Sequence, residues 1–201
     1  MRDIERELAR AKKGRDDLAA GAASRFADEA GAAGLVDVAY ASVDSPLGPL
    51  FVASTRKGLV RLAYPGETDL AAELASSISP RVLEAPARLD RVRRELDEYF
   101  EGTRRRFEVE IDWRLISGFA TRVLRATSRV PYGRLVTYRE VARRAGSPNA
   151  YRAAGNALGS NPIPIVVPCH RVVREGGGLG GYTGGLDRKR LLLRIEGAYE
   201  E

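Results

Sequence analysis

The single cysteine and the single histidine of this chain are neighbours, Cys169 and His170. A thiol becomes a nucleophile when an imidazole, a cation or a helix end stabilises its thiolate. The pair follows the apolar run 163–167 and is flanked by Pro168 and Arg171, so the sequence predicts a buried segment that presents thiol and imidazole together. Two plainer interpretations stay open, because a lone cysteine is commonly a small buried hydrophobe and a lone histidine a hydrogen-bonded core residue.

The counts of cysteine and histidine exclude two kinds of site. One cysteine forms no intramolecular disulfide, and one cysteine with one histidine supplies at most two ligands where zinc takes three or four. We therefore expect no metal site. Residues 1–17 lack the apolar stretch of a secretory signal, and no apolar run approaches the roughly 18 residues of a membrane span. These features predict a cytoplasmic protein without membrane contact.

Composition and charge indicate a globular protein with one basic half. The chain has 201 residues, 44% hydrophobic and 30% charged, which suits one or two domains that fold without disulfides. Residues 1–111 carry 18 basic and 20 acidic side chains, whereas residues 112–201 carry 15 and 7. Arginine supplies 29 of the 33 basic residues, which favours phosphate contact but equally fits nucleotide bias in the source genome.

The first half of the chain predicts a small α/β domain after an N-terminal extension. Residues 1–32, rich in Ala, Arg, Asp and Glu, predict either a weakly amphipathic helix or a mobile extension. Three alternating, β-branched runs separated by turn signals predict an antiparallel meander. These runs are 36–43, 45–55 and 57–64, with helices expected near 67–78 and 88–101 and a further candidate strand at 104–112.

The second half predicts helices and a helix-turn-helix. A helix from residue 118 stops at the Val-Pro-Tyr-Gly of 130–133. A short helix at 138–145, a Gly-Ser-Pro-Asn turn and a helix at 149–158 then follow the spacing of a helix-turn-helix. Helical hairpins with a glycine turn are common, so DNA binding stays open on this stretch alone. The expected units are an extension at 1–34, an α/β domain at 35–112 and a DNA-binding domain at 113–201.

Several short motifs in one order resemble a known family, the O6-alkylguanine-DNA alkyltransferases, or methylated-DNA–protein-cysteine methyltransferases. The similarity covers residues 36–197, and a related branch of the family carries tryptophan where this chain has Cys169. The cysteine therefore favours the active branch. The matching motifs are Pro-Cys-His-Arg-Val at 168–172, Val-Pro-Tyr-Gly at 130–133, Thr-Tyr-Arg-Glu at 137–140, Arg-Ala-Ala-Gly at 152–155, Asn-Pro-Ile-Pro-Ile at 161–165, Gly-Gly-Tyr-Thr-Gly-Gly-Leu at 180–186 and the Glu196-Gly197 helix end.

The resemblance implies a fold and a set of catalytic roles. The fold is α/β (α+β): a small ribonuclease-H-like domain with a three-stranded antiparallel sheet, then a mainly helical domain with a helix-turn-helix. Cys169 would take the alkyl group from O6 of a damaged guanine, and His170 would remove the thiol proton through a water molecule. Glu196 would hold the imidazole, as the orienting residue of a triad does. Asn161 would brace the network, and Tyr138 would donate a proton near N3 of the departing guanine.

The same resemblance implies a substrate pocket beneath a lid. The backbone carbonyl of Val172, with that of the cysteine, would accept from the exocyclic amine of guanine. Tyr182 and Leu158 would form pocket walls, and the region of Thr183 would donate to O6. The glycine-rich loop 175–185 would act as the lid; by composition alone it is a turn. Threonine at 183 replaces the more usual serine or glycine, which bears on the size of alkyl group accepted.

For DNA, the resemblance implies binding in the minor groove of a duplex that contains O6-alkylguanine. The damaged nucleotide must leave the base stack to reach a buried thiol, and Arg152 would fill the gap. The small side chains of Ala153 and Gly155 would let the second helix approach closely, with Tyr138 beside it. The family implies a monomer that needs no cofactor and acts once, because the thioether product is not readily reversed. Activity on O4-alkylthymine stays open.

Two rival functions stay under consideration. A damage sensor or regulator would keep DNA binding but lose transfer, and Cys169 itself speaks against it. A cysteine hydrolase would use the same thiol and imidazole, but it would turn over repeatedly on an ester or amide and retain no adduct.

Overall fold

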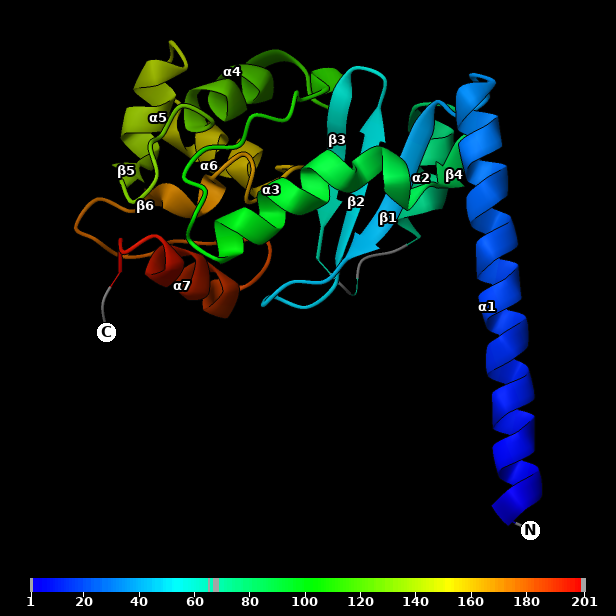
Figure 1. Cartoon of the computed structure of the whole chain (residues 1–201). Helices are drawn as coiled ribbons and strands as arrows, with labels where there is room; N and C mark the ends of the chain where they lie inside the picture. The colour runs from blue at the N-terminus through cyan, green and yellow to red at the C-terminus, as the bar shows by residue number, and fades with distance from the viewer. Residues whose placement is uncertain (1, 65, 67–68, 200–201) are drawn as a thin grey trace.

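The structure is a computed structural model that describes residues 2–64, 66 and 69–199. A mixed sheet stands between a long helix on one side and a helical layer on the other (Figure 1). This is the expected α/β class, with a sheet domain followed by a mainly helical domain. No helix in the described part of the chain is both long and apolar enough to span a membrane.

The N-terminal sheet confirms the predicted meander and adds a strand to it. β1, β2 and β3 pair antiparallel in chain order, and β4 pairs parallel with β1, so the strand order is β3-β2-β1-β4. β4 is not predicted by the sequence pattern, because a three-residue strand is too short to show an alternation. The bounds in this half are α1 Arg2–Ala32, β1 Val38–Val43, β2 Leu50–Thr55, β3 Gly58–Ala63, α2 Leu70–Ser77, β4 Val82–Glu84 and α3 Asp90–Phe100. The expected helix start at 67–68 lies outside the described residues.

The candidate strand at 104–112 was wrong. This segment forms only an isolated bridge between Ile111 and Leu59 of β3. Two of its backbone donors bond to a side chain instead of a strand, because the carboxylate of Glu95 accepts from the backbone N–H of Glu108 at 2.7 Å and of Val109 at 3.3 Å. A buried side chain thus takes the place of a neighbouring strand.

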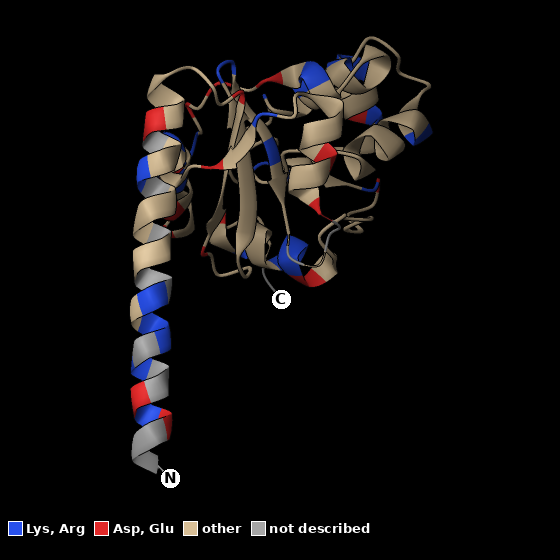
Figure 2. Ribbon diagram, turned by 90° about the vertical axis from the view of Figure 1, so that its right-hand side faces the viewer, with Lys and Arg blue, Asp and Glu red and all other residues tan. Residues whose placement is uncertain are grey.

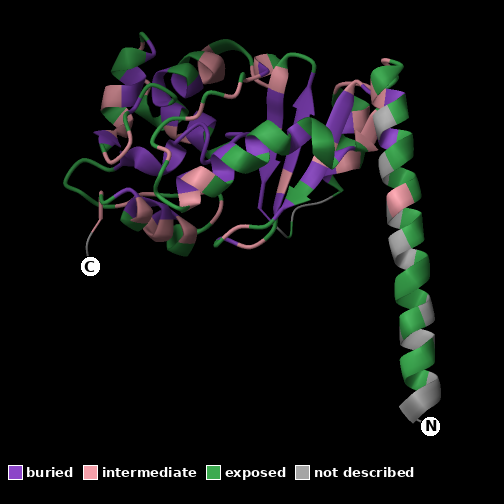
Figure 3. Ribbon diagram, viewed as in Figure 1, coloured by how far each residue is buried: buried purple, intermediate pink, exposed green. Residues whose placement is uncertain are grey.

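The N-terminal extension is a helix, and the buried residues among its described side chains lie near its end. Ala27 and Ala30 of α1 are buried with Val36, Ala39 and Ala85, whereas most of the remaining described surface of the helix is exposed (Figure 3). Residues 2–32 carry seven basic and seven acidic side chains, and both kinds occur along α1 (Figure 2), so this helix adds nothing to the net positive charge of the chain. Of the two expectations for this segment, the structure has the helix.

The C-terminal half contains the predicted helix-turn-helix. Its elements are α4 Gly118–Thr127, β5 Val136–Thr137, α5 Tyr138–Arg144, α6 Tyr151–Gly159, the 3₁₀ turn Cys169–Arg171, β6 Val172–Val173 and α7 Leu186–Ile195. Gly146 begins the turn between α5 and α6 with φ of 78°, a left-handed conformation that glycine adopts without a Cβ penalty. β5 and β6 pair in parallel, with Val136 opposite Val172, so the start of α5 lies beside the segment that follows the cysteine.

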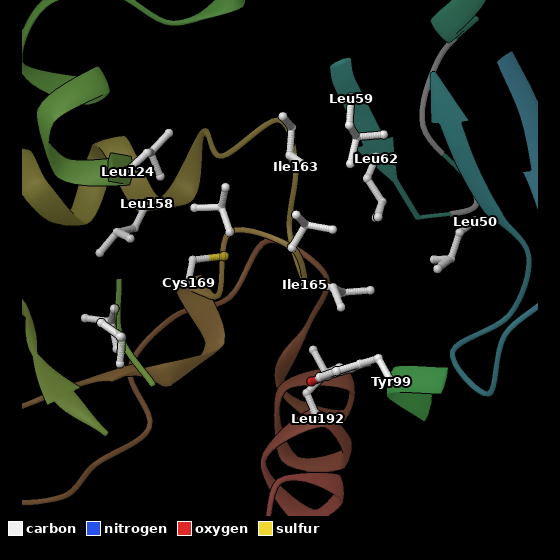
Figure 4. Packing of buried hydrophobic residues seen from close by; sticks show 14 of the residues in the cluster. Leu50, Leu59, Leu62, Tyr99, Leu124, Leu158, Ile163, Ile165, Cys169 and Leu192 are labelled. Carbon is white, nitrogen blue, oxygen red and sulfur yellow. The ribbon is translucent and has the colours of Figure 1, made fainter. Parts of the chain in front are cut away.

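One hydrophobic core joins the two halves. Leu50, Leu59 and Leu62 of the sheet belong to the same buried cluster as Leu124, Ile163, Ile165, Cys169 and Leu192 of the helical half (Figure 4). A backbone hydrogen bond of 2.8 Å from the N–H of Leu62 to the carbonyl of Pro162 fixes the segment before the cysteine against β3. The sheet domain therefore supports the segment on which the thiol lies.

Candidate active site

The thiol of Cys169 is buried, with 5% of the residue exposed. The amide nitrogen Nδ2 of Asn161 lies 3.2 Å from its Sγ and also donates to the carbonyl of Val167 at 2.8 Å. The other amide atom, Oδ1, accepts from the N–H of Ile163 at 3.1 Å. Asn161 thus holds the turn before the cysteine and donates to the sulfur, at the place where the resemblance implied a bracing residue.

The apolar run before the cysteine contains a strained residue. Ile165 has φ of 72°, a left-handed conformation that is an outlier for a β-branched side chain. It is fully buried, and the surrounding turn is closed by a 2.9 Å bond from the N–H of Val167 to the carbonyl of Ile163. Strain of this kind persists where packing over-determines the backbone, so the position of the thiol is fixed by its core.

His170 is fully buried, and its Nε2 lies 2.8 Å from Oε1 of Glu196, the residue that ends α7. Burial lowers the pKa of His170, although the hydrogen bond and charge of Glu196 oppose the shift. A neutral imidazole beside a carboxylate carries its proton on Nε2, which leaves a lone pair on Nδ1. Nδ1 is buried and has no hydrogen-bond partner within the described residues. The imidazole therefore has one nitrogen free to act as a base.

Glu196 is the centre of a buried hydrogen-bond network. Besides His170, its carboxylate accepts from the Tyr99 hydroxyl at 2.7 Å, from Nε and Nη2 of Arg171 at 2.8 and 2.9 Å, and from the N–H of Gly133 at 3.1 Å. Burial alone would raise the pKa of Glu196, but the hydrogen bonds from His170 and Arg171 and the charge of Arg171 outweigh it and hold the pKa at about 2. Glu196 is thus an anion that fixes the imidazole in place.

The thiol itself is protonated at neutral pH. Burial raises the pKa of Cys169 to about 11, opposed by the hydrogen bond from Asn161 and the charge of Lys189. A thiol with this pKa must lose its proton to a base during the reaction. His170 is the next residue in the chain, and its free Nδ1 is a buried basic atom that can take this role.

Two residues that contact the site, Lys189 and Tyr99, were not predicted from the sequence. Lys189 on α7 is fully buried, and its Nζ donates to the carbonyl of Val172 at 2.6 Å and to the carbonyl of Leu179. Burial lowers the pKa of Lys189 to about 8. The sequence did contain a signal for Lys189, because every other basic residue after position 57, apart from His170, is an arginine. Tyr99, on α3 of the sheet domain, gave no signal, because its contact with the site is made only by folding.

A cleft of about 890 Å³ opens onto the thiol from the helix-turn-helix side. It brings together seven of the residues expected from the sequence, namely Tyr138, Arg152, Gly155, Leu158, Cys169, Tyr182 and Thr183. The side chains of His170, Glu196 and Asn161 lie behind the cysteine, Val172 is fully buried, and Ala153 lies on the exposed surface of α6. Three exposed arginines, Arg139, Arg152 and Arg174, also line the cleft.

The loop expected as a lid borders this cleft. A Cβ at Gly180 would lie 2.6 Å from the hydroxyl of Tyr138, so the loop passes against that phenol where only glycine fits. Burial raises the pKa of Tyr138, which keeps its hydroxyl protonated. The hydroxyl of Thr183 donates to the carbonyl of Gly159 at 2.6 Å, so its proton is already engaged by the end of α6. In this arrangement the Thr183 side chain joins the loop to α6 and is not directed as a donor into the cleft.

The outer edge of the cleft is basic and exposed. Arg152, the second residue of α6, is exposed, and its guanidinium carbon lies 5.8 Å from the centre of the Tyr151 ring. Arg139 of α5 lies 5.3 Å from the same ring. Within residues 2–64, 66 and 69–199, no group of three or more His, Cys, Asp and Glu side chains is placed to hold a metal ion.

Fold and site together define a class of protein: a helix-turn-helix protein whose second helix borders a cleft that leads to a buried thiol with an imidazole and a carboxylate behind it. Family models agree. The model described as 6-O-methylguanine DNA methyltransferase, ribonuclease-like domain, matches residues 38–113, and the one described as its DNA binding domain matches residues 118–198.

Individual relatives give the same result. A methylated-DNA–protein-cysteine methyltransferase of Mycolicibacterium paratuberculosis is 41% identical over 159 residues, which cover 79% of this chain and 92% of that protein. A protein of the same name from Methanosarcina barkeri is 36% identical over 157 residues, covering 78% and 96%. The crystal structure of Mycobacterium tuberculosis OGT in complex with DNA has a TM-score of 0.68 at 38% identity, covering 79% and 92%. This chain belongs to the 6-O-methylguanine DNA methyltransferase family.

Proposed function

We propose that this protein repairs O6-alkylguanine in double-stranded DNA by moving the alkyl group to Cys169, once per molecule. The observation that carries the proposal is the position of the thiol: it lies at the inner end of the cleft beside α6, with His170 and Glu196 behind it. Family membership supports direct reversal of DNA damage as the function. The chemistry requires no metal or other cofactor, because the cysteine keeps the group.

The transfer conserves atoms and charge with the residues of this site. Sγ of Cys169 forms a bond to the alkyl carbon while the bond from that carbon to O6 breaks, and its electrons pass to the guanine ring. The thiol proton goes to Nδ1 of His170 through a water molecule, and Glu196 stabilises the imidazolium that forms. Guanine leaves as a neutral base if a proton reaches N3, and the protonated hydroxyl of Tyr138 is the donor we propose.

For DNA we propose docking of α6 in the minor groove, with the damaged nucleotide extruded into the cleft. Arg152 is exposed at the cleft edge, where it can occupy the space that the nucleotide leaves. Ala153 and Gly155 give α6 a surface of small side chains. Tyr138 lies under that surface, 3.8 Å from where a Cβ of Gly155 would stand. Tyr182 and Leu158, which line the cleft, would then lie against the extruded base. The carbonyl of Val172, which also accepts from Lys189, is the acceptor we propose for the exocyclic amine.

We further propose that the protein acts as a monomer in the cytoplasm, since the site is completed within one chain and a free thiol acceptor suits a reducing compartment.

One experiment tests the transfer directly. The protein is incubated with a duplex oligonucleotide that contains O6-methylguanine, and intact mass and peptide mass are measured. We expect one methyl group per protein, on Cys169, and a plateau after one turnover. A Cys169→Ser variant should gain no mass and should still bind the duplex in a mobility-shift assay, because the hydroxyl is a far weaker nucleophile in an unchanged binding surface. Binding without mass gain by the wild-type protein would favour the sensor, and repeated turnover without adduct the hydrolase.

A further inference from the structure

One wall of the thiol cleft is held from the other domain. The hydroxyl of Tyr182, in the loop over the cleft, lies 2.5 Å from the hydroxyl of Tyr64, the residue that follows β3 in the sheet domain. The two rings meet edge to face with centres 6.1 Å apart. On its other side the Tyr182 ring stands perpendicular to the imidazole of His170, with ring centres 6.5 Å apart. Tyr182 therefore lies between His170, the base of the proposed reaction, and Tyr64 of the N-terminal domain.

Tyr64 is itself fixed, so it can act as an anchor. Only 4% of the residue is exposed, and the guanidinium carbon of Arg188 lies 4.7 Å from its ring centre. Arg188 also donates to the carbonyl of Gly184 in the loop at 3.0 Å and to the carbonyl of Leu47 in the sheet domain at 3.4 Å. This arginine covers one face of the Tyr64 ring and joins loop and sheet domain at the same point.

The loop also fits the Tyr64 ring closely. A Cβ at Gly184 would lie 2.5 Å from Cε2 of Tyr64, closer than side chains approach. The loop backbone therefore rests directly on this ring, two residues beyond Tyr182. The hydroxyl bond and the backbone contact together leave the Tyr182 phenol little freedom to move away from the thiol.

We infer that Tyr64 is a positioning residue that sets the size of alkyl group the thiol pocket accepts. The inference rests on the proposed transfer to Cys169. A tethered Tyr182 keeps the wall near the sulfur, which suits a small group such as methyl. A Tyr182 freed from its hydroxyl partner can swing outward, which admits a larger group such as benzyl. Specificity of this kind is a difference between two substrates at one site, so it is measured as a ratio of rates.

The test uses one oligonucleotide duplex that carries either O6-methylguanine or O6-benzylguanine. The second-order rate of Cys169 modification is measured by intact mass for wild-type protein and for Tyr64→Phe. We expect the ratio of benzyl to methyl rate to rise about 2- to 13-fold, which is the net free energy of one hydrogen bond, about 0.5–1.5 kcal/mol, converted at 1.36 kcal/mol per tenfold. A merely structural loss lowers the folded fraction and both rates equally, so it leaves the ratio unchanged.

Two further variants complete the test. Tyr182→Phe removes the same bond from the other side, so the change in ratio for the double variant should equal that of either single variant and not their sum. Tyr40→Phe removes a hydroxyl from the same sheet, where Tyr40 stacks on Phe51, and should leave the ratio unchanged. An unchanged ratio in Tyr64→Phe, or additive effects in the double variant, would overturn the inference while transfer stands. Absence of transfer to wild-type Cys169 would instead overturn the proposed function.

Discussion

Replacing Tyr99 by phenylalanine removes one donor from the carboxylate of Glu196 and leaves the ring in place. Both residues are buried, with 1% and 6% exposed, and the hydroxyl lies 2.7 Å from Oε1. A hydrogen bond to a charged group contributes about 1.5–3 kcal/mol to folding. We expect Tyr99→Phe to lower the free energy of unfolding at pH 7 by this amount, a large part of a total of about 5–15 kcal/mol. For a chain of this length the melting temperature should fall by about 3–12 °C.

The same contact predicts how the loss changes with pH. Burial, followed by the charge of Glu196, raises the pKa of Tyr99 above its usual 10. A group whose pKa is raised in the folded state stabilises the protein below its unfolded pKa and loses that contribution as pH rises above it. The difference between wild type and Tyr99→Phe should therefore be constant from about pH 5 to 9. It should shrink by about 1.4 kcal/mol per pH unit above pH 10, where only the wild type must keep a buried tyrosine protonated.

Urea unfolding at pH 7, 9 and 10.5 measures this difference. Tyr40→Phe is the matched control, because Tyr40 is half-buried and packs on Phe51 without a hydrogen bond to the active-site carboxylate. We expect the control to change stability by less than about 0.5 kcal/mol. Equal stability of Tyr99→Phe and wild type at pH 7 would refute the assignment of the hydroxyl to Glu196. A difference that stays constant up to pH 10.5 would refute the reasoning on protonation.

Three further predictions concern the reaction. Arg152→Ala should slow repair of O6-methylguanine in a duplex much more than reaction with free O6-benzylguanine, and an equal loss on both would assign the arginine to structure. Glu196→Gln should slow labelling of Cys169 by a small alkylating reagent at pH 7 at least tenfold, because it removes the charge that stabilises the imidazolium. An unchanged rate in a variant that is folded by circular dichroism would show that Glu196 does not activate the thiol. Deleting residues 1–32 should leave the single-turnover rate within about twofold of wild type, since the proposed catalytic residues all lie between positions 138 and 196. A truncated protein that is folded but inactive would contradict this.

Local sequence patterns were sufficient for the elements that local interactions dictate. The meander follows from alternating β-branched residues, and the helix-turn-helix follows from helix-forming runs on either side of Gly146. The adjacency of Cys169 and His170 predicted the thiol and imidazole, because covalent neighbours need no tertiary information. The fold class and the family came instead from the resemblance of several short motifs to a known family.

The rest depended on contacts between distant segments. Tyr99 reaches Glu196 across 97 positions, and no local pattern records such a distance. The strand expected at 104–112 had the composition of a strand, but the carboxylate of Glu95 accepts from two of its backbone N–H groups, those of Glu108 and Val109. Glu196 itself reads as an ordinary helix-end residue, and only the resemblance to a family selected it. Buried polar networks are specified by the whole fold, which is why short windows of sequence miss them.

The network around Glu196 also governs when the thiol becomes reactive during folding. Its donors come from α3, from the turn at Gly133 and from the segment after the cysteine, and the carboxylate comes from the end of α7. These elements are distant along the chain, so the network forms only when they have packed together. A nascent or partly unfolded chain therefore has an ordinary thiol without its oriented base. The pairing of the thiol with an oriented base is therefore a property of the tertiary fold and not of the two neighbouring residues alone.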